Sequence, residues 1–160
     1  MKKNIPIVLA SDNNYAKYLN VTLTSILSNA KKDTFYDIYL LITPDFSDKN
    51  IDLILSDASR HNNNKINFIK FDKNFASEYK LLYHTAKPTF YRLKIAEILP
   101  SIYDKWLYFD TDVIVNIDLQ EYYNIDLKNN IVAGVYDCGI MDKEFEKFSP
   151  NHKKTISVPD

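Results

Sequence analysis

Two aspartates, Asp110 and Asp112, stand two positions apart directly after an apolar run, and their spacing suits metal chemistry. Two carboxylates at this spacing beyond a strand can both reach one hard cation, and oxygen ligands suit Mg²⁺ or Mn²⁺. Such a metal screens a pyrophosphate and supports its departure as a leaving group. Apolar residues on both sides sharpen this interpretation, because two anions between buried segments repel each other unless a cation or a donor compensates them. A solvated turn that ends a strand is the alternative, and the context alone leaves both open.

A second polar cluster, with Asp12, Asn14 and Tyr15, follows an apolar, β-branched run near the N-terminus. A side chain of this kind before a helix commonly caps it, which explains one of the three residues. A tyrosine beside a carboxylate also suits a nucleobase, because the ring stacks on the base while Asp12 accepts an N–H from its edge. A carboxylate acceptor favours uracil, whose N3 carries a proton, over cytosine, whose N3 does not. Helix capping and base binding both remain open.

Arg92, one of only two arginines, suits a bidentate contact with a carboxylate or a phosphate, and a surface arginine is the alternative. Asp137 follows an apolar, strand-like segment, so it either faces the same crevice or ends a turn. The histidines His61, His84 and His152 stand singly in polar segments, which favours solvated side chains over ligands. A two-metal phosphohydrolase needs further ligands that converge on one point, and it is therefore the weaker hypothesis.

The composition excludes several classes of protein. The chain has 160 residues, of which 46% are hydrophobic, enough for about one domain with a real core. Its 20 basic and 21 acidic residues leave a net charge of -1, which disfavours nucleic acid as a partner. Only two glycines occur, Gly134 and Gly139, so neither a G-x-G-x-x-G fingerprint nor a Walker loop is present. If a nucleotide binds, another group must neutralise its phosphates.

The single cysteine, Cys138, excludes an intrachain disulfide and fits a reducing compartment, so we expect a cytoplasmic protein. The apolar run after Lys2 and Lys3 is too short for a signal peptide. No apolar run approaches the ~20 residues of a spanning helix. The sequence leaves peripheral attachment to the inner membrane open.

Strand and helix patterns alternate along the chain and must position these residues. Apolar runs predict strands over 5–10, 35–42, 66–71, 106–109 and 131–136, and an extended segment over 113–117. Helical patterns follow the cap-type residues 12–14, with apolar positions from 19 to 30, and cover about 47–60 and 89–99. This order predicts an α/β fold, with a mostly parallel sheet and helices on both faces. Ligands of such sheets bind at the carboxyl ends of the strands, where the strand order reverses. The first and fourth strands are expected to flank that point, which places residues 11–15 and 110–112 in one crevice.

Four segments together resemble the N-terminal part of the family 8 glycosyltransferases, which include bacterial lipopolysaccharide glucosyl- and galactosyltransferases and glycogenin-like enzymes. The segments are 7–15, 89–93, 107–113 and 133–137. The resemblance implies a GT-A type, Rossmann-like fold, with residues 1–160 as a single nucleotide-sugar-binding domain. It also implies retaining transfer of a hexose, glucose or galactose, from a UDP-sugar to a glycan or lipid-linked saccharide, with lipopolysaccharide or another bacterial surface glycan as the expected acceptor.

The resemblance further implies which residues serve the reaction. Asp110 and Asp112 match carboxylates that bind Mn²⁺, or Mg²⁺, and Asp137 matches a position that faces the donor sugar and the acceptor. Tyr15 matches a tyrosine that stacks on uracil, and Arg92 an arginine that lies against the donor. The expected donor-binding set is Ala10, Ser11, Asp12, Asn14, Tyr15, Arg92, Asp110, Thr111 and Asp112.

The second half of the family pattern has no counterpart in this chain. That half carries a late histidine motif, whose histidine is the third protein ligand of the metal. His152 does not qualify, because the residues after it lack the motif's glycine. We therefore expect a domain truncated at its C-terminal end, and a weak or inactive transferase when these residues act alone. A non-catalytic UDP-sugar-binding remnant is the alternative.

Overall fold

The computed structural model describes residues 4–72, 74–75 and 88–135. The chain divides into two compact units, Met1–Asn124 and Ile125–Asp160, which are described separately. The strands of the first unit are β1 (Asn4–Ser11), β2 (Phe35–Ile42), β3 (Asn64–Lys70) and β4 (Leu107–Phe109). Its helices are α1 (Ala16–Ser28), α2 (Asp48–Ala58), α3 (Pro88–Tyr91), the 3₁₀ turn η1 (Arg92–Lys94), α4 (Ile95–Ile98) and α5 (Gln120–Tyr123).

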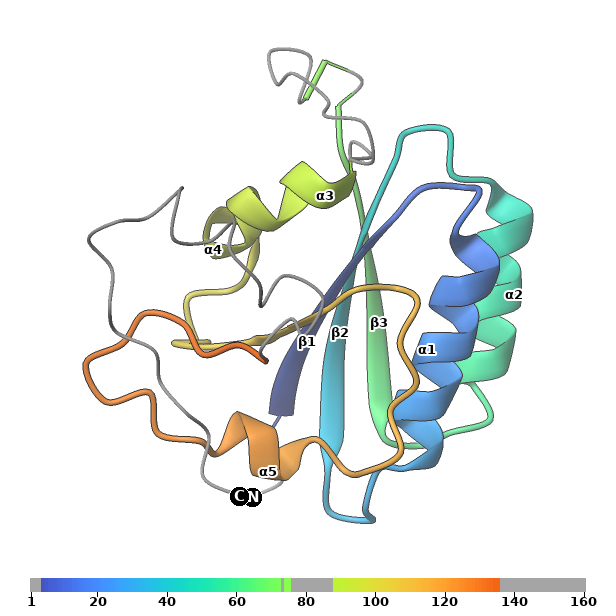
Figure 1. The fold of residues 1–160 in the computed structure, drawn as a ribbon. Helices are drawn as coiled ribbons and strands as arrows, with labels where there is room; N and C mark the ends of the chain where they lie inside the picture. The colour runs from blue at the N-terminus through green and yellow to red at the C-terminus, as the bar shows by residue number, and fades with distance from the viewer. Residues whose placement is uncertain (1–3, 73, 76–87, 136–160) are drawn as a thin grey trace, which may run out of the picture. The chain divides into compact units, whose positions relative to one another are not determined.

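The four strands form one parallel sheet in the order β3-β2-β1-β4 (Figure 1). β1 pairs with β2 on one side and with β4 on the other, with Ile7 opposite Leu107 and Leu9 opposite Phe109. The strand order therefore reverses between β1 and β4, where the sequence placed the switch point. The prediction of an α/β fold with a mostly parallel sheet is confirmed.

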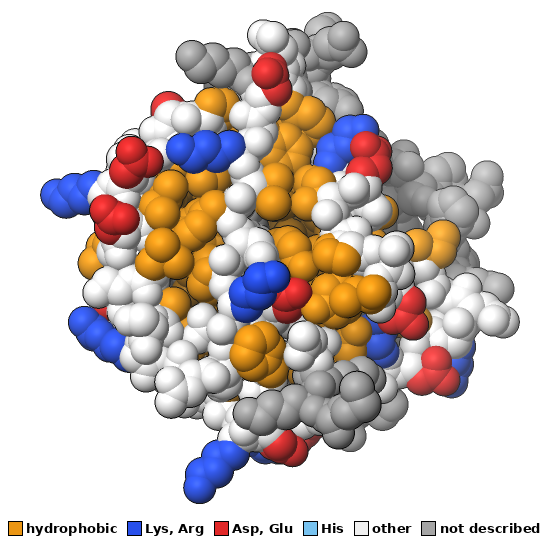
Figure 2. All heavy atoms as spheres, turned by 180° about the vertical axis from the view of Figure 1, so that it is seen from behind, with side chains coloured by type: hydrophobic (Ala, Val, Ile, Leu, Met, Phe, Trp, Pro, Cys, Tyr) orange, Lys and Arg blue, Asp and Glu red, His pale blue; other side chains and the backbone are white. Residues whose placement is uncertain are grey.

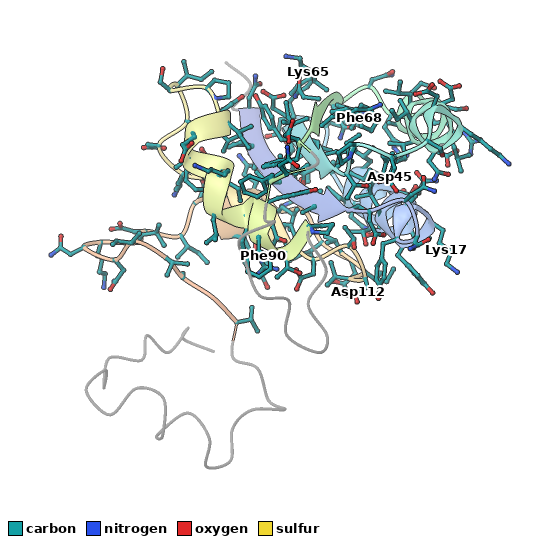
Figure 3. All side chains as sticks on the ribbon, turned by 90° about the horizontal axis from the view of Figure 1, so that it is seen from above. Lys17, Asp45, Lys65, Phe68, Phe90 and Asp112 are labelled. Carbon is teal, nitrogen blue, oxygen red and sulfur yellow. The ribbon has the colours of Figure 1, made fainter. Side chains whose placement is uncertain are left out.

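Helices cover both faces of the sheet. Side chains alternate in direction along each strand, so apolar residues point to both faces and each face needs a cover. Ile7 and Leu9 of β1 belong to the core under α1 and α2, whereas Val8 belongs to the core under α3 and α4. All three side chains are fully buried. Figures 1 and 3 show the sheet between the α1–α2 layer and the α3–α4 layer.

The predicted helix over 89–99 is wrong as one continuous element. The structure divides it into α3, η1 and α4, although Tyr91, Ile95 and Leu99 still share one buried face. The Nε–H of Arg92 donates to the carbonyl of Thr89 at 2.9 Å. In a continuous α-helix that carbonyl would accept the backbone N–H four residues later. The Tyr91 ring stacks on Phe71 with their centroids 3.9 Å apart.

The predicted strand over 131–136 is also wrong for the residues that the structure describes. Residues 131–135 form no strand, and Ile131, Val132 and Val135 are 98%, 74% and 90% exposed. An apolar, β-branched run indicates strand propensity, but a strand also needs a partner and a surface to pack against. No strand occurs among the described residues of the second unit. Asp137 and Cys138 lie outside the described ranges.

Acidic and basic side chains are interspersed around hydrophobic ones on the face seen in Figure 2. That distribution agrees with the near-zero net charge, and this face carries no broad field of one sign. β3 is an edge strand, and its Ile66, Phe68 and Ile69 are only partly buried. Among the residues described, no helix has both the length and the apolar character to cross a membrane.

A buried carboxylate, Asp118, ties the segment after β4 to the start of β2. Its oxygens accept the backbone N–H groups of Lys31 at 2.7 Å and Gln120 at 2.9 Å, and the Tyr36 hydroxyl lies 3.3 Å away. The same hydroxyl oxygen accepts the N–H of Leu119 at 3.0 Å. Burial raises the pKa of Tyr36 to about 12, so the phenol stays neutral.

Burial by itself would raise the pKa of Asp118, but its hydrogen bonds, with the backbone N–H groups of Lys31 and Gln120 foremost, outweigh burial and lower the pKa below the ordinary 3.8. The folded chain therefore binds the Asp118 proton less readily than the unfolded chain does. Ionised Asp118 stabilises the fold above the unfolded-state pKa, and this contribution is lost as the pH falls through the folded-state pKa.

Asp118→Asn is expected to lower the free energy of unfolding at neutral pH by about 1–3 kcal/mol, because one carboxylate oxygen that accepts hydrogen bonds becomes an amide donor. It should also flatten the loss of stability below about pH 4. Urea denaturation at a series of pH values measures both effects. Asp52→Asn, at an exposed position of α2, is the matched control and should change neither. If the free energy of unfolding falls equally at acid pH for Asp118→Asn and for the unsubstituted chain, Asp118 does not have the lowered pKa assigned to it.

Candidate functional site

An open pocket of about 300 Å³ lies at the carboxyl ends of β1 and β4. It is lined by Ala10, Ser11, Asp12, Tyr15, Pro88, Thr89, Arg92, Tyr108, Asp110, Thr111 and Asp112. Every described residue of the predicted donor-binding set lines this pocket except Asn14, which is exposed in the β1–α1 loop. Asp137, the predicted catalytic residue, lies outside the described ranges.

The pairing of β1 with β4 explains why the two polar clusters meet. Leu9 lies opposite Phe109, and β1 continues along β2 to Ser11, so the end of β1 and the residues after β4 lie at one edge of the sheet. Side-chain alternation places Ala10 and Tyr108 on the face covered by α3 and α4. Asp110, the first residue after β4, lies 3.3 Å from Arg92 of η1. Figure 3 labels Phe90 on α3 and Asp112 in the segment that follows β4.

The β1–α1 loop is held by its own side chains. Asp12 Oδ1 accepts the backbone N–H of Tyr15 at 3.0 Å, and Ser11 Oγ donates to the Asp12 carbonyl at 2.9 Å. Asp12 therefore closes a turn before α1 and does not cap the helix, because Tyr15 is the N-cap of α1 and no side chain caps it. The Tyr15 side chain stays 46% exposed, and its ring lies 5.3 Å from that of Tyr18. An exposed aromatic face thus stands at the edge of the pocket.

Asn13, which the sequence analysis passed over, fixes this loop to α2. Its Oδ1 accepts the backbone N–H of Ser47 at 3.0 Å and a side-chain N–H of Asn50 at 2.9 Å. Ser47 is also the N-cap of α2, as its position before the helix predicted, and its Oγ accepts the N–H of Asn50 at 3.3 Å. The start of α2 therefore helps to set the position of the pocket wall.

Arg92 projects from η1 into the pocket and has three contacts. Its Nη2 lies 3.3 Å from Asp110 Oδ1, its Nε donates to Thr89, and its Cζ lies 4.6 Å from the centroid of the Tyr108 ring. The side chains of Arg92 and Asp110 remain 42% and 63% exposed, so their ion pair is solvated and weak. Burial raises the pKa of Tyr108 to about 12; the charge of Arg92 lowers it and that of Asp110 raises it.

Asp110 and Asp112 are both exposed, whereas Thr111 between them is buried. Two exposed carboxylates provide hard oxygen donors of the kind that Mn²⁺ and Mg²⁺ prefer, so their chemistry fits such a cation. No group of three or more His, Cys, Asp or Glu side chains within ligand reach of a common ion exists in the described part of the chain. These residues therefore offer a partial coordination sphere, open to water and anionic oxygens.

Three lining residues were not assigned to the site from sequence: Pro88, Thr89 and Tyr108. Tyr108 stands two positions before Asp110, and residues two apart along an extended segment point to the same side. That spacing could have assigned Tyr108 to the site from the sequence. Pro88 and Thr89 reach the pocket because α3 packs over β1. The sequence alone does not give that packing.

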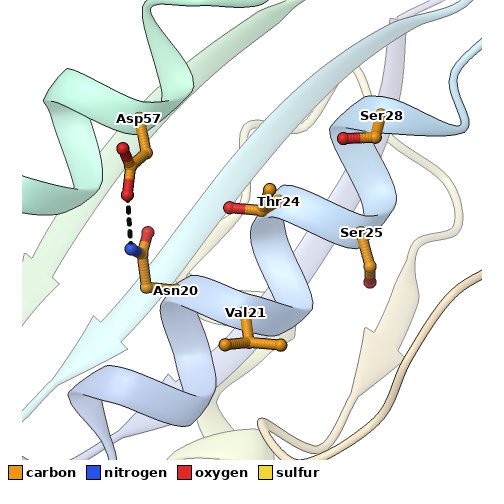
Figure 4. Close-up of a pocket in the computed structure, with 6 residues that line it drawn as sticks. All are labelled: Asn20, Val21, Thr24, Ser25, Ser28 and Asp57. Carbon is orange, nitrogen blue, oxygen red and sulfur yellow. Dashed lines mark hydrogen bonds between the residues drawn. The ribbon is translucent and has the colours of Figure 1, made fainter.

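A second hollow, of about 440 Å³, lies on the outer side of α1 (Figure 4). It is lined by Asn20, Val21, Thr24, Ser25, Ser28 and Asp57. Asp57 is already engaged, by Asn20 Nδ2 at 2.6 Å and by Arg60 at 3.2 Å. This hollow brings no set of reactive side chains together, and the β1–β4 pocket remains the candidate site.

The chain is similar to known glycosyltransferases in sequence and in structure. The sequence model described as "Glycosyl transferase family 8" matches residues 6–159. A Haemophilus influenzae protein with a provisional glycosyltransferase name is 31% identical over 95% of this chain, and glycosyltransferase GlyF of Streptococcus pneumoniae is 31% identical over 86%. The chain spans 43% and 32% of the lengths of these two relatives.

Solved structures of glycosyltransferases are also similar to this chain. A galactosyltransferase LgtC, crystallised with donor and acceptor sugar analogues, is 28% identical and superposes with a TM-score of 0.77. That superposition covers 89% of this chain and 51% of the LgtC chain. The bifunctional glycosyltransferase WbbM is 30% identical, with a TM-score of 0.71 over 86% of this chain and 24% of its own.

Arg92→Gln is expected to tighten the binding of Mn²⁺ to the nucleotide-free chain by about two- to fivefold, since it removes the cation that pairs with Asp110. Arg92→Lys retains the positive charge and is the matched comparison, with a smaller change expected. Electron paramagnetic resonance of free Mn²⁺ gives the dissociation constants. Weaker Mn²⁺ binding by Arg92→Gln would show that the arginine does not compete for the carboxylate.

Proposed function

The chain belongs to glycosyl transferase family 8 and has the GT-A fold of its structural neighbours, and on that premise we propose that it is the donor-binding part of a metal-dependent, retaining hexosyltransferase. The donor is a UDP-hexose, with glucose or galactose as the sugar. The acceptor is a hydroxyl group of a glycan or lipid-linked saccharide, such as lipopolysaccharide. The single cysteine supports a cytoplasmic location. One observation carries the proposal: the pocket combines an acidic pair, an exposed tyrosine and an arginine.

The β1–α1 side of the pocket suits the uridine. The exposed Tyr15 ring offers a stacking surface to the base. Asp12 offers a carboxylate that accepts an N–H from the edge of uracil, Asn14 lies in the same loop, and Ala10 lies near the end of β1. Because the Tyr15 N–H, Ser47 and Asn50 already hold this loop, it needs little ordering when the nucleotide binds.

The β4 side suits the diphosphate. Asp110 and Asp112 would hold Mn²⁺ or Mg²⁺, which supplies positive charge that stabilises the departing UDP. Arg92 is a second positive group at this wall, and on nucleotide binding its guanidinium is free to exchange the weak contact with Asp110 for a phosphate oxygen. These groups replace the glycine loop that the composition excludes. Asp137 is proposed to face the donor sugar and the acceptor.

A non-catalytic UDP-sugar-binding module is the second candidate. One observation favours it: the described residues offer only a partial coordination sphere for a metal ion. This module would bind UDP with Mn²⁺ and would not turn over the donor.

Calorimetry with UDP and Mn²⁺, run beside a hydrolysis and transfer assay with UDP-glucose and UDP-galactose, separates these functions. We expect Mn²⁺-dependent UDP binding with weak or absent turnover by the 160 residues alone. Robust turnover would contradict the expectation that the chain is weak by itself and would exclude the binding module. No UDP binding in the presence of Mn²⁺ would overturn both functions.

Asp110→Asn and Asp112→Asn should each abolish the Mn²⁺-dependent part of the UDP affinity, because each removes a charged metal ligand. Tyr15→Ala should weaken UDP binding about tenfold through the loss of base stacking, with little change in melting temperature since the ring is exposed. Calorimetry measures all three, and Asp52→Asn on α2 is the control. Unchanged UDP affinity in all three variants would leave the pocket without a donor-binding role.

A further inference from the structure

The segment that carries Asp110 and Asp112 leaves the sheet directly after β4. β4 ends at Phe109, and residues 110–117 belong to no strand. Their backbone polar groups therefore need partners outside the sheet, because unpaired buried N–H and C=O groups are costly. Figure 1 shows this segment passing from β4 alongside α1 towards α5.

Polar side chains of α1 provide those partners. Thr22 Oγ1 lies 2.8 Å from the carbonyl oxygens of both Thr111 and Val113. Ser25 Oγ accepts the N–H of Val115 at 3.0 Å, and Asn29 Nδ2, just beyond the helix, donates to the Val115 carbonyl at 2.9 Å. We call Thr22, Ser25 and Asn29 the polar face of α1.

The spacing of the polar face is that of one side of a helix, at positions i, i+3 and i+7. The polar face contacts residues 111–115 in the order of the chain, with Thr22 at the start of the segment and Asn29 at its end. The side chains of a helix thus take the place of a neighbouring strand for this stretch of backbone.

Thr22 is the buried member of the polar face, at 1% exposure, and its two partners lie on either side of Asp112. Thr111 is 7% exposed, so little water reaches this contact to compete for the carbonyl oxygen. Ser25 Oγ donates to the Thr22 carbonyl at 2.7 Å, which links two members of the polar face.

We infer that the polar face of α1, and Thr22 above all, is the positioning element that fixes the spacing and direction of the Asp110 and Asp112 carboxylates for a divalent cation. The inference rests on the proposed function, since it assumes that these aspartates bind a metal. With two carboxylates and no cluster of three ligands in the described part of the chain, cation affinity depends strongly on how well the pair is preorganised. Thr22 does not touch the cation and acts only through the backbone.

Thr22→Val tests this because valine keeps the shape of threonine and removes the hydroxyl. We expect the Mn²⁺ affinity of the nucleotide-free, 160-residue chain to fall about tenfold or more, as substitutions of outer-shell partners commonly cause. Thr22→Ser, which keeps the hydroxyl, should retain the affinity within about threefold. Thr24→Val is the matched control, because it makes the same exchange at an exposed position of the same helix (Figure 4).

Electron paramagnetic resonance of free Mn²⁺ measures the affinity, and circular dichroism measures folding and the melting temperature. A folded Thr22→Val chain with unchanged Mn²⁺ affinity would overturn the inference and leave Thr22 a structural residue. If Thr22→Val does not fold, Ser25→Ala decides instead: it removes the acceptor for Val115, and weaker Mn²⁺ binding supports the inference whereas unchanged binding overturns it. An unsubstituted chain that binds no Mn²⁺ would overturn the proposed metal site and this inference together.

Discussion

The parallel pairing of β1 with β4 is the constraint on which the candidate site depends. It joins strands that are about a hundred residues apart in sequence, and it does so through three residue pairs between Ile7–Leu9 and Leu107–Phe109. Because β4 ends opposite Leu9 and β1 ends soon after at Ser11, the acidic segment and the β1–α1 loop emerge at the same edge of the sheet. The pairing is short, so the site needs additional supports outside the sheet.

Those supports are buried polar contacts between the segment after β4 and earlier parts of the chain. The polar face of α1 holds residues 111–115, and Asp118 accepts the backbone N–H of Lys31. Both are long-range contacts in poorly hydrated surroundings, where a satisfied hydrogen bond specifies geometry and an unsatisfied group is costly. The fold thus positions the acidic pair by side-chain hydrogen bonds where strand pairing ends.

The charge balance within the pocket follows from the residue types available. A chain with two glycines has no glycine-rich loop for phosphates, so under the proposed function the positive charge would come from Arg92 and from a cation at Asp110 and Asp112. Arg92 and Asp110 carry opposite charges, and their contact needs little desolvation because both side chains are solvated. The weakness of that pair is what leaves the carboxylate open to exchange.

The sequence by itself determined the four described strands, α2 with its Ser47 cap, and the meeting of residues 11–15 with 110–112, because these follow from local hydrophobic period and from the rules of parallel sheets. Tertiary structure alone decided the rest. The break between α3 and α4 accompanies a contact of the Arg92 side chain, residues 131–135 form no strand without a partner, and Thr22 acquires its partners from a segment about ninety residues away. A pattern in sequence reports what a segment prefers, whereas these outcomes depend on which distant groups the folded chain brings within hydrogen-bond reach.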